Sequence, residues 1–196
     1  MIKFNFSKVF QKSGNDLETT PGLLILIGFI KESGAKASAI LWSSYVLIVT
    51  SLNENLSDFK NKAFIISNTA SFCGFNRKFD GLQSIWDKYK KDGLVVIGVP
   101  SNDFNQEAKT NAEVKTLCET NFSVDFILAE ISNVRGKNAH PLFKYLVDNL
   151  GIRSAPKWNF YKYIIDRNGA PVDYFSSVTK PDSSKFISAV ERELYS

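Results

Sequence analysis

The residue of this chain with the clearest chemical potential is Cys73, because it stands between two different structural patterns. The apolar run at 63–66 precedes it and predicts a strand, while apolar residues at helical spacing follow between positions 82 and 89. A thiol on a strand-to-helix turn lies near backbone amides and the positive end of a helix dipole. Both favour the thiolate, which is the reactive form of cysteine. Taken alone, the pattern fits a small buried hydrophobe equally well.

The remaining cysteine and histidine content limits the chemistry. The fourth position of a Cys-x-x-Cys pair starting at Cys73 is Asn76, so a two-thiol disulfide oxidoreductase centre is disfavoured. Two cysteines exclude a disulfide scaffold and a cysteine-based zinc site. The single histidine, His140, precedes a proline at a predicted helix start, and we interpret it as structural. We expect no metal and no bound cofactor.

Length and composition describe an ordinary globular chain. With 196 residues, 44% of them hydrophobic and 22% charged, the natural expectation is one domain. The net charge of +4 is modest, and no basic stripe with interleaved aromatic residues appears. We therefore expect no nucleic-acid partner.

The N-terminal segment resembles a secretory signal peptide. An apolar run at 23–30 follows several lysines and precedes the small-residue pattern Ala35-Lys36-Ala37. Cleavage after Ala37 would leave a mature domain of residues 38–196, exported to the periplasm or secreted. The run is too short to span a bilayer, so stable membrane insertion is not expected. The alternative is a cytoplasmic protein with a disordered leader, or an uncleaved anchor.

Strand and helix patterns alternate along the rest of the chain, in the order β-α-β-α-β-α-β-β-α. The predicted strands are 63–69, 94–99, 124–128, 161–165 and 171–175; the predicted helices are 79–91, 111–120, 141–150 and one beginning near Pro181. This order predicts an α/β sandwich with central parallel strands. Because α/β proteins place their sites beyond the carboxyl ends of such strands, the turn bearing Cys73 lies at the expected edge.

Five short blocks in order give the chain a family resemblance. They are NTASFCGF (68–75), GVPSNDF (98–104), GKNAHPL (136–142), KWNF (157–160) and TKP (179–181). Together they resemble the glutathione peroxidase family, a branch of the thioredoxin fold, from about Leu56 to Leu194. The resemblance implies a thioredoxin-like α/β sandwich in which helices flank a central mixed sheet.

The resemblance also implies an activity and its partners. It makes Cys73 the peroxidatic cysteine of a thiol-dependent peroxidase, which reduces hydrogen peroxide or organic hydroperoxides and forms a sulfenic acid. It implies an external thiol, thioredoxin or glutathione, as the reductant and a place in the response to oxidative stress. In the family, Trp158 and Asn159 would offer N–H groups to the sulfur, and such neutral donors stabilise a thiolate.

The second block departs from the family pattern. Asp103 stands where the family has glutamine, and a carboxylate beside Cys73 would disfavour the thiolate. The alternatives are that Asp103 points away, is protonated or takes part in proton transfer. Gln106 is a candidate substitute for that glutamine, although it aligns better with the family's later Gln-Glu pair, and Asn102 is a second candidate supporting residue. The loop at 104–110 lacks the family's glycines and proline, so its conformation should differ.

The second thiol, Cys118, has two interpretations. The resemblance places it near the helix position of a resolving cysteine, which attacks the sulfenic acid to form a disulfide. Its position on the apolar face of the helix predicted at 111–120 is also typical of a buried cysteine. A bridge would need the two Cα atoms within about 7 Å, and hence local unwinding of that helix.

Two other functions compete with a peroxidase. Asp103 and the altered loop motivate a thioredoxin-fold redox-sensing or binding protein with weak or lost turnover. A general thiol–disulfide exchanger is a third hypothesis, which Asn76 disfavours. The rate at which peroxide oxidises Cys73 separates the first two, and reduction of insulin disulfides tests the third.

Overall fold

The computed structural model of the chain describes residues 59–195. The strands in this range are β1 (Ala63–Thr69), β2 (Leu94–Pro100), β3 (Ile127–Leu128), β4 (Lys162–Ile165) and β5 (Pro171–Phe175). The helices are α4 (Lys78–Tyr89), α5 (Asn111–Phe122), α6 (Pro141–Leu150) and α7 (Ser184–Tyr195), with short 3₁₀ turns at Lys90–Asp92 and Ile152–Ser154.

The strands form one mixed sheet in the order β3-β2-β1-β4-β5. β1 pairs in parallel with β2, which pairs in parallel with β3, whereas β4 runs antiparallel to both β1 and β5. In this register Thr69 lies opposite Pro100, and Ser67 lies opposite Lys162. The carboxyl ends of β1 and β2 and the start of β4 therefore meet at one edge of the sheet.

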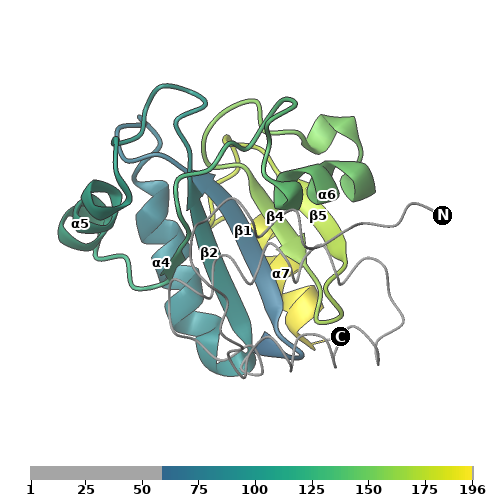
Figure 1. Cartoon of the computed structure of the whole chain (residues 1–196). Helices are drawn as coiled ribbons and strands as arrows, with labels where there is room; N and C mark the ends of the chain where they lie inside the picture. Colours follow the sequence, from purple (N-terminus) through teal and green to yellow (C-terminus); the bar gives the residue numbers. More distant parts are fainter. Residues whose placement is uncertain (1–58, 196) are drawn as a thin grey trace, which may run out of the picture. The chain divides into compact units, whose positions relative to one another are not determined.

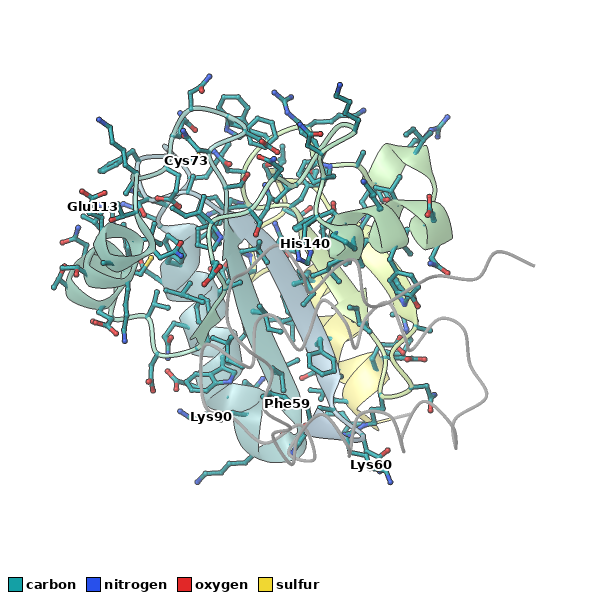
Figure 2. All side chains as sticks on the ribbon, viewed as in Figure 1. Phe59, Lys60, Cys73, Lys90, Glu113 and His140 are labelled. Carbon is teal, nitrogen blue, oxygen red and sulfur yellow. The ribbon has the colours of Figure 1, made fainter. Side chains whose placement is uncertain are left out.

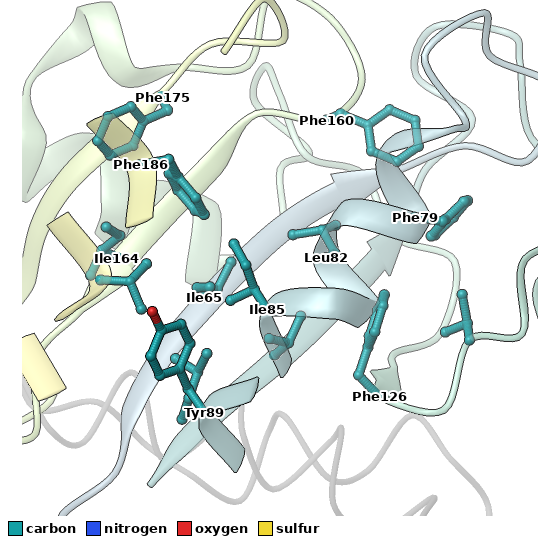
Figure 3. Packing of buried hydrophobic residues seen from close by; sticks show 14 of the residues in the cluster. Ile65, Phe79, Leu82, Ile85, Tyr89, Phe126, Phe160, Ile164, Phe175 and Phe186 are labelled. Atoms are coloured by element: carbon teal, nitrogen blue, oxygen red, sulfur yellow. The ribbon is translucent and has the colours of Figure 1, made fainter. Parts of the chain in front are cut away.

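Helices cover both faces of the sheet (Figure 1). One core cluster joins the sheet to apolar residues of α4, α5 and α7, and Figure 3 shows its aromatic members, among them Phe79, Phe160 and Phe186. A second cluster joins the other face to α6 through Leu142, Phe143 and Leu146. Such a two-sided cover explains why β2 is buried at every position. The predicted α/β sandwich with a central mixed sheet is confirmed.

Two predicted elements differ in extent from the observed ones. The strand predicted at 124–128 is limited to β3, because Ser123 ends α5 in a left-handed conformation and the next amides bond elsewhere. Val124 N–H donates to the Cys118 carbonyl, and Asp125 N–H donates to the Gln83 side chain. The last helix begins at Ser184 rather than near Pro181, because residues 180–183 form a turn.

The predicted signal peptide at 1–37, and with it the boundary at residue 38, lies outside the described residues. Within residues 59–195, no helix combines the length and apolar character that crossing a membrane requires.

Candidate active site

Three loops meet at the edge of the sheet where β1 and β2 end. The loop after β1 carries Cys73, the loop after β2 carries residues 101–110, and the segment before β4 carries residues 155–161. Figure 2 shows Cys73 at the end of the domain opposite Phe59, which lies near the start of β1. Topology therefore brings together the cysteine block, the second block and the KWNF block, as their family resemblance implies.

Cys73 lies in a chain of turns ahead of α4 and is 1% exposed. Its sulfur accepts from the Phe75 N–H at 3.5 Å, and its carbonyl accepts from the Asn76 N–H at 2.9 Å. Helix α4 itself starts only at Lys78. The donor that faces the sulfur is thus an amide of the turn rather than one of the first helical amides, but the strand-to-helix placement is confirmed.

Gln106 and Asn159 form a hydrogen-bonded pair between the second and third loops. The Asn159 Nδ2 group donates to Gln106 Oε1 at 3.0 Å, and the Phe72 N–H donates to the Gln106 carbonyl at 3.0 Å. Gln106 therefore links the cysteine loop to Asn159. The sequence predicted that Asn159 donates to the sulfur; here the amide donates to a carbonyl oxygen, which accepts hydrogen bonds more strongly than sulfur does.

Trp158 lies at the surface of the same edge. It is 40% exposed, and its ring packs against Phe104 at a centroid distance of 5.4 Å and a tilt of 51°. Its carbonyl accepts from the Asn68 side chain at 3.1 Å. Among the described contacts its indole N–H has no bond to the Cys73 sulfur, so the predicted donation is absent from this conformation.

The structure turns the Asp103 carboxylate toward another segment. Its Oδ2 atom accepts from the Val134 N–H at 2.7 Å and from the Arg135 N–H at 3.1 Å. The Arg135 guanidinium in turn donates to the Asp103 carbonyl at 3.0 Å. The carboxylate therefore points away from Cys73, which is one of the orientations that the sequence left open, and two backbone amides hold it there. Asn102 is exposed, and its side chain accepts from the Glu107 N–H at 3.2 Å, so it shapes the loop.

This arrangement predicts how an Asp103→Asn variant behaves. The amide keeps one oxygen but loses the charge, so we expect a loss of about 1 kcal/mol in the free energy of unfolding. We expect the pH midpoint of Cys73 alkylation to stay unchanged, because the carboxylate points elsewhere. Urea denaturation and the pH profile of iodoacetamide labelling provide the two measurements. A clear fall in the alkylation midpoint would instead place the carboxylate beside the thiol.

Glu107 is a site residue to which the sequence analysis assigned no role. It is 7% exposed, and its Oε1 atom accepts from the Ser71 N–H at 3.1 Å and from the Ala108 N–H at 2.8 Å. Its Oε2 atom is buried without a hydrogen-bond partner in the described part of the chain. The carboxylate thus ties the cysteine loop, through the Ser71 amide, to the loop after β2. In the sequence, only its position next to Gln106 indicated that Glu107 lies at the site.

Cys118 lies beneath the same loop, on the inner side of α5. It is fully buried, and burial raises the pKa of its thiol to about 12, with the charge of Glu107 adding to the effect and the nearby Ser71 side chain opposing it. Both cysteines are free thiols. In this conformation Cys118 is protonated at neutral pH, so the prediction that it resolves a sulfenic acid remains a prediction that requires α5 to open.

Two buried lysines lie under the site and were not predicted. Lys78 donates to the carbonyls of Val178 and Thr179 at 3.5 and 3.0 Å, and burial lowers its pKa, while the nearby charges of Asp182 and Cys73 raise it. Lys162 is fully buried on β4.

His140 is confirmed as a structural residue. Its Nδ1 atom accepts from the Leu142 N–H at 3.3 Å at the start of α6, and burial lowers the pKa of the ring. Within residues 59–195, no group of three or more His, Cys, Asp or Glu side chains could hold a metal ion.

A buried thiol on a strand-to-helix turn at the edge of a thioredoxin-like sheet, with a glutamine–asparagine pair bonded to its loop, defines a class of thiol-dependent oxidoreductases. The model of the glutathione peroxidase family matches residues 45–147. The chain therefore belongs to the glutathione peroxidase family.

Relatives and a solved structure agree with this assignment. The glutathione peroxidase homolog BsaA of Bacillus subtilis (strain 168) is 43% identical over 141 residues, which cover 69% of this chain and 88% of that protein. The hydroperoxy fatty acid reductase gpx1 of Synechocystis sp. is 42% identical over 136 residues, covering 65% of this chain and 80% of that protein. The crystal structure of Trgpx in apo form matches with a TM-score of 0.56 and 31% identity, over 72% of this chain and 86% of that chain. The resemblance seen in the five blocks is confirmed.

Proposed function

We propose that this thiol-dependent peroxidase reduces hydroperoxides with Cys73 as its nucleophile. The thiolate attacks one peroxide oxygen, the O–O bond breaks as an S–O bond forms, and the sulfur is oxidised to a sulfenic acid. The other oxygen leaves with a proton as water or an alcohol. One external thiol then condenses with the sulfenic acid, releasing water, and a second thiol releases Cys73 as its thiol and leaves with the first as a disulfide.

The observation that supports this function best is the placement of Cys73 beside the Gln106–Asn159 pair. Gln106 is joined to the cysteine loop through its backbone and to Asn159 through its side chain. Neutral amides placed in this way stabilise negative charge on sulfur and on the leaving oxygen without a permanent cation. We assign that role to Gln106 and Asn159, with Trp158 covering the opening at the surface.

The surface around the site favours an organic hydroperoxide as substrate. The exposed large apolar side chains near the edge are Phe72, Phe75, Trp158 and Val178. Apolar side chains around a reactive centre favour contact with an apolar substrate chain. The name of the Synechocystis relative, a hydroperoxy fatty acid reductase, points to the same substrate class.

The experiment that tests the function compares two reductants in parallel. Steady-state consumption of hydrogen peroxide and of cumene hydroperoxide is measured with thioredoxin and its reductase, and with glutathione and its reductase. Turnover with either reductant supports the peroxidase. If Cys73 is oxidised by peroxide but neither thiol system gives turnover, the redox-sensing hypothesis is favoured. Reduction of insulin without peroxide turnover would favour a thiol–disulfide exchanger.

We expect the sulfenic acid to form before Cys118 reacts, because the Cys118 thiol is buried and protonated. One equivalent of peroxide should produce an adduct with dimedone on Cys73 while the Cys118 thiol is still present. Quenched-flow labelling followed by mass spectrometry measures both groups. Loss of both thiols at the same rate would show that the sulfenic acid does not accumulate and would identify Cys118 as a rapid resolving cysteine.

We also propose export, with removal of residues 1–37. The support is the apolar run at 23–30 and the small-residue pattern before residue 38. Mass spectrometry of protein from the native host should find an N-terminus at Ser38. A full-length chain in the cytoplasm would contradict the proposal.

A further inference from the structure

The segment that carries Trp158 and Asn159 is held in an unusual backbone conformation. Phe160, the next residue, has a φ of 64°, in the left-handed region that residues with a Cβ atom rarely adopt. Its ring is fully buried in the core and packs edge-on against Phe79 at 5.2 Å. A bulky residue persists in this region only where its surroundings determine the conformation.

Asn68 on β1 contributes three of the bonds that determine it. Its Nδ2 group donates to the Trp158 carbonyl at 3.1 Å, and its Oδ1 atom accepts from the Tyr161 N–H at 2.9 Å. Its backbone carbonyl accepts from the Phe160 N–H at 2.6 Å. The Asn68 side chain is fully buried, and both ends of its amide are used.

Two more side chains bind the remaining carbonyls of the segment. Ser177 Oγ donates to the Asn159 carbonyl at 2.5 Å, and Lys162 Nζ donates to the Phe160 carbonyl at 2.6 Å. Lys162 also donates to the Ser176 carbonyl at 3.0 Å. Three consecutive carbonyls, from Trp158 to Phe160, are therefore each bound by a side chain from a different part of the chain.

Lys162 is fully buried although the proposed reaction gives it no role. Its side chain has no exposed surface, and burial, together with the charge of Lys78, lowers its pKa to about 7. A neutral amine has two N–H groups, and the structure provides two carbonyl acceptors. A fully buried lysine is rare among proteins, and here its bonds go to the backbone of the two loops that it joins.

We propose that Asn68, Ser177 and Lys162 are positioning residues that impose the left-handed turn at Phe160 and so hold the Trp158 ring on Phe104 and the Asn159 amide on Gln106, which is bonded to the cysteine loop. These three residues are called the carbonyl clamp below. The inference rests on the proposed roles of Trp158 and Asn159 in the peroxidase.

Geometry explains why the turn needs such a clamp. Trp158 points outward onto Phe104, and the adjacent Asn159 points inward to Gln106. Asn68 belongs to the same strand that leads into Cys73, so its bonds also set the separation between the cysteine loop and the donor segment. Loss of the clamp lets the turn relax and moves the Asn159 amide away from Gln106 and the Trp158 ring away from Phe104, while the strand pairing of the sheet is kept.

The test uses two neutral substitutions, so that no charge near Cys73 changes. Asn68→Leu keeps the size of the side chain and removes both ends of the amide, and Ser177→Ala removes the single bond to the Asn159 carbonyl. We expect the second-order rate of Cys73 oxidation by hydrogen peroxide to fall at least tenfold in Asn68→Leu and at least threefold in Ser177→Ala. The rate is read by stopped flow on the pH-independent plateau, where the thiol is fully ionised.

Tyr163→Phe is the matched control. The Tyr163 hydroxyl donates to the Ser154 carbonyl at 2.6 Å, fully buried in the α6 cluster on the other face of the sheet, so its removal also deletes a buried bond to a carbonyl. We expect the rate of Cys73 oxidation in Tyr163→Phe to stay within twofold of that in the parent protein. We expect its thermal midpoint to fall by about as much as in the clamp variants.

The outcomes separate a positioning role from a purely structural one. Clamp variants that lose stability like Tyr163→Phe but react as fast as the parent protein overturn the proposal. If Asn68→Leu does not fold, Ser177→Ala alone decides by the same criterion. A parent protein that does not react with peroxide refutes the peroxidase function instead, so the two failures are distinguishable.

Discussion

Replacing Cys73 with serine is expected to abolish peroxide consumption down to the uncatalysed background. A serine hydroxyl is far less nucleophilic than a thiolate, and its oxygen cannot accept a peroxide oxygen as sulfur does. The two side chains are similar in size, and Cys73 is one small member of a large core cluster, so the fold should be retained. The assay follows loss of hydrogen peroxide with thioredoxin and with glutathione as reductants, and circular dichroism checks the fold.

Cys118→Ser provides the matched control for that result. It also replaces a buried thiol by a hydroxyl, on the inner side of α5. We expect Cys118→Ser to retain the rate of Cys73 oxidation within about twofold, since a resolving cysteine acts only after that step. Full peroxide consumption in Cys73→Ser would contradict the assignment of Cys73 as the nucleophile. If Cys118→Ser alone lost the initial reaction with peroxide, Cys118 would be the nucleophile instead.

The fold could be predicted from the sequence because its strands and helices carry strong periodic patterns. The continuous apolar run of β2 indicated a strand covered on both faces, and Pro141 with Gly151 marked both ends of α6. The short β3 was harder to predict, because its length depends on where α5 ends. That end is set by Ser123 in a left-handed conformation and by bonds to residues distant in sequence, which local patterns do not reveal.

The loops at the edge of the sheet could be predicted as a group, but not the partners within them. The motif blocks and the parallel register brought Cys73, Gln106 and Asn159 to one place. The orientation of Asp103 was left open, because the sequence does not show that two amides at 134–135 bind its carboxylate. Lys162 was missed for a similar reason, since lysine in a strand pattern is ordinarily read as exposed.

Asn159→Asp is expected to slow the oxidation of Cys73 strongly at neutral pH. The new carboxylate would be fully buried, beside Gln106 and next to the cysteine loop, and it would replace the Nδ2 donor by an acceptor. A like charge near the sulfur disfavours the thiolate, and each pH unit by which the alkylation midpoint rises lowers the thiolate fraction about tenfold, or about 1.4 kcal/mol. We expect a shift of at least about one unit by this rule. Stopped-flow oxidation and the pH profile of alkylation measure the rate and the midpoint.

Asn149→Asp is the control, because it makes the same substitution far from the thiol. The Asn149 side chain donates to the Tyr145 carbonyl at 2.8 Å within α6, so the variant also loses one donor bond. A carboxylate near the end of a helix is unfavourable by about 0.3–1 kcal/mol, so stability should fall while the alkylation midpoint stays in place. Equal midpoints in the two variants would show that Asn159 does not act on the sulfur. A raised alkylation midpoint in Asn159→Asp alone establishes that the charge at position 159 acts on the ionisation of the Cys73 thiol.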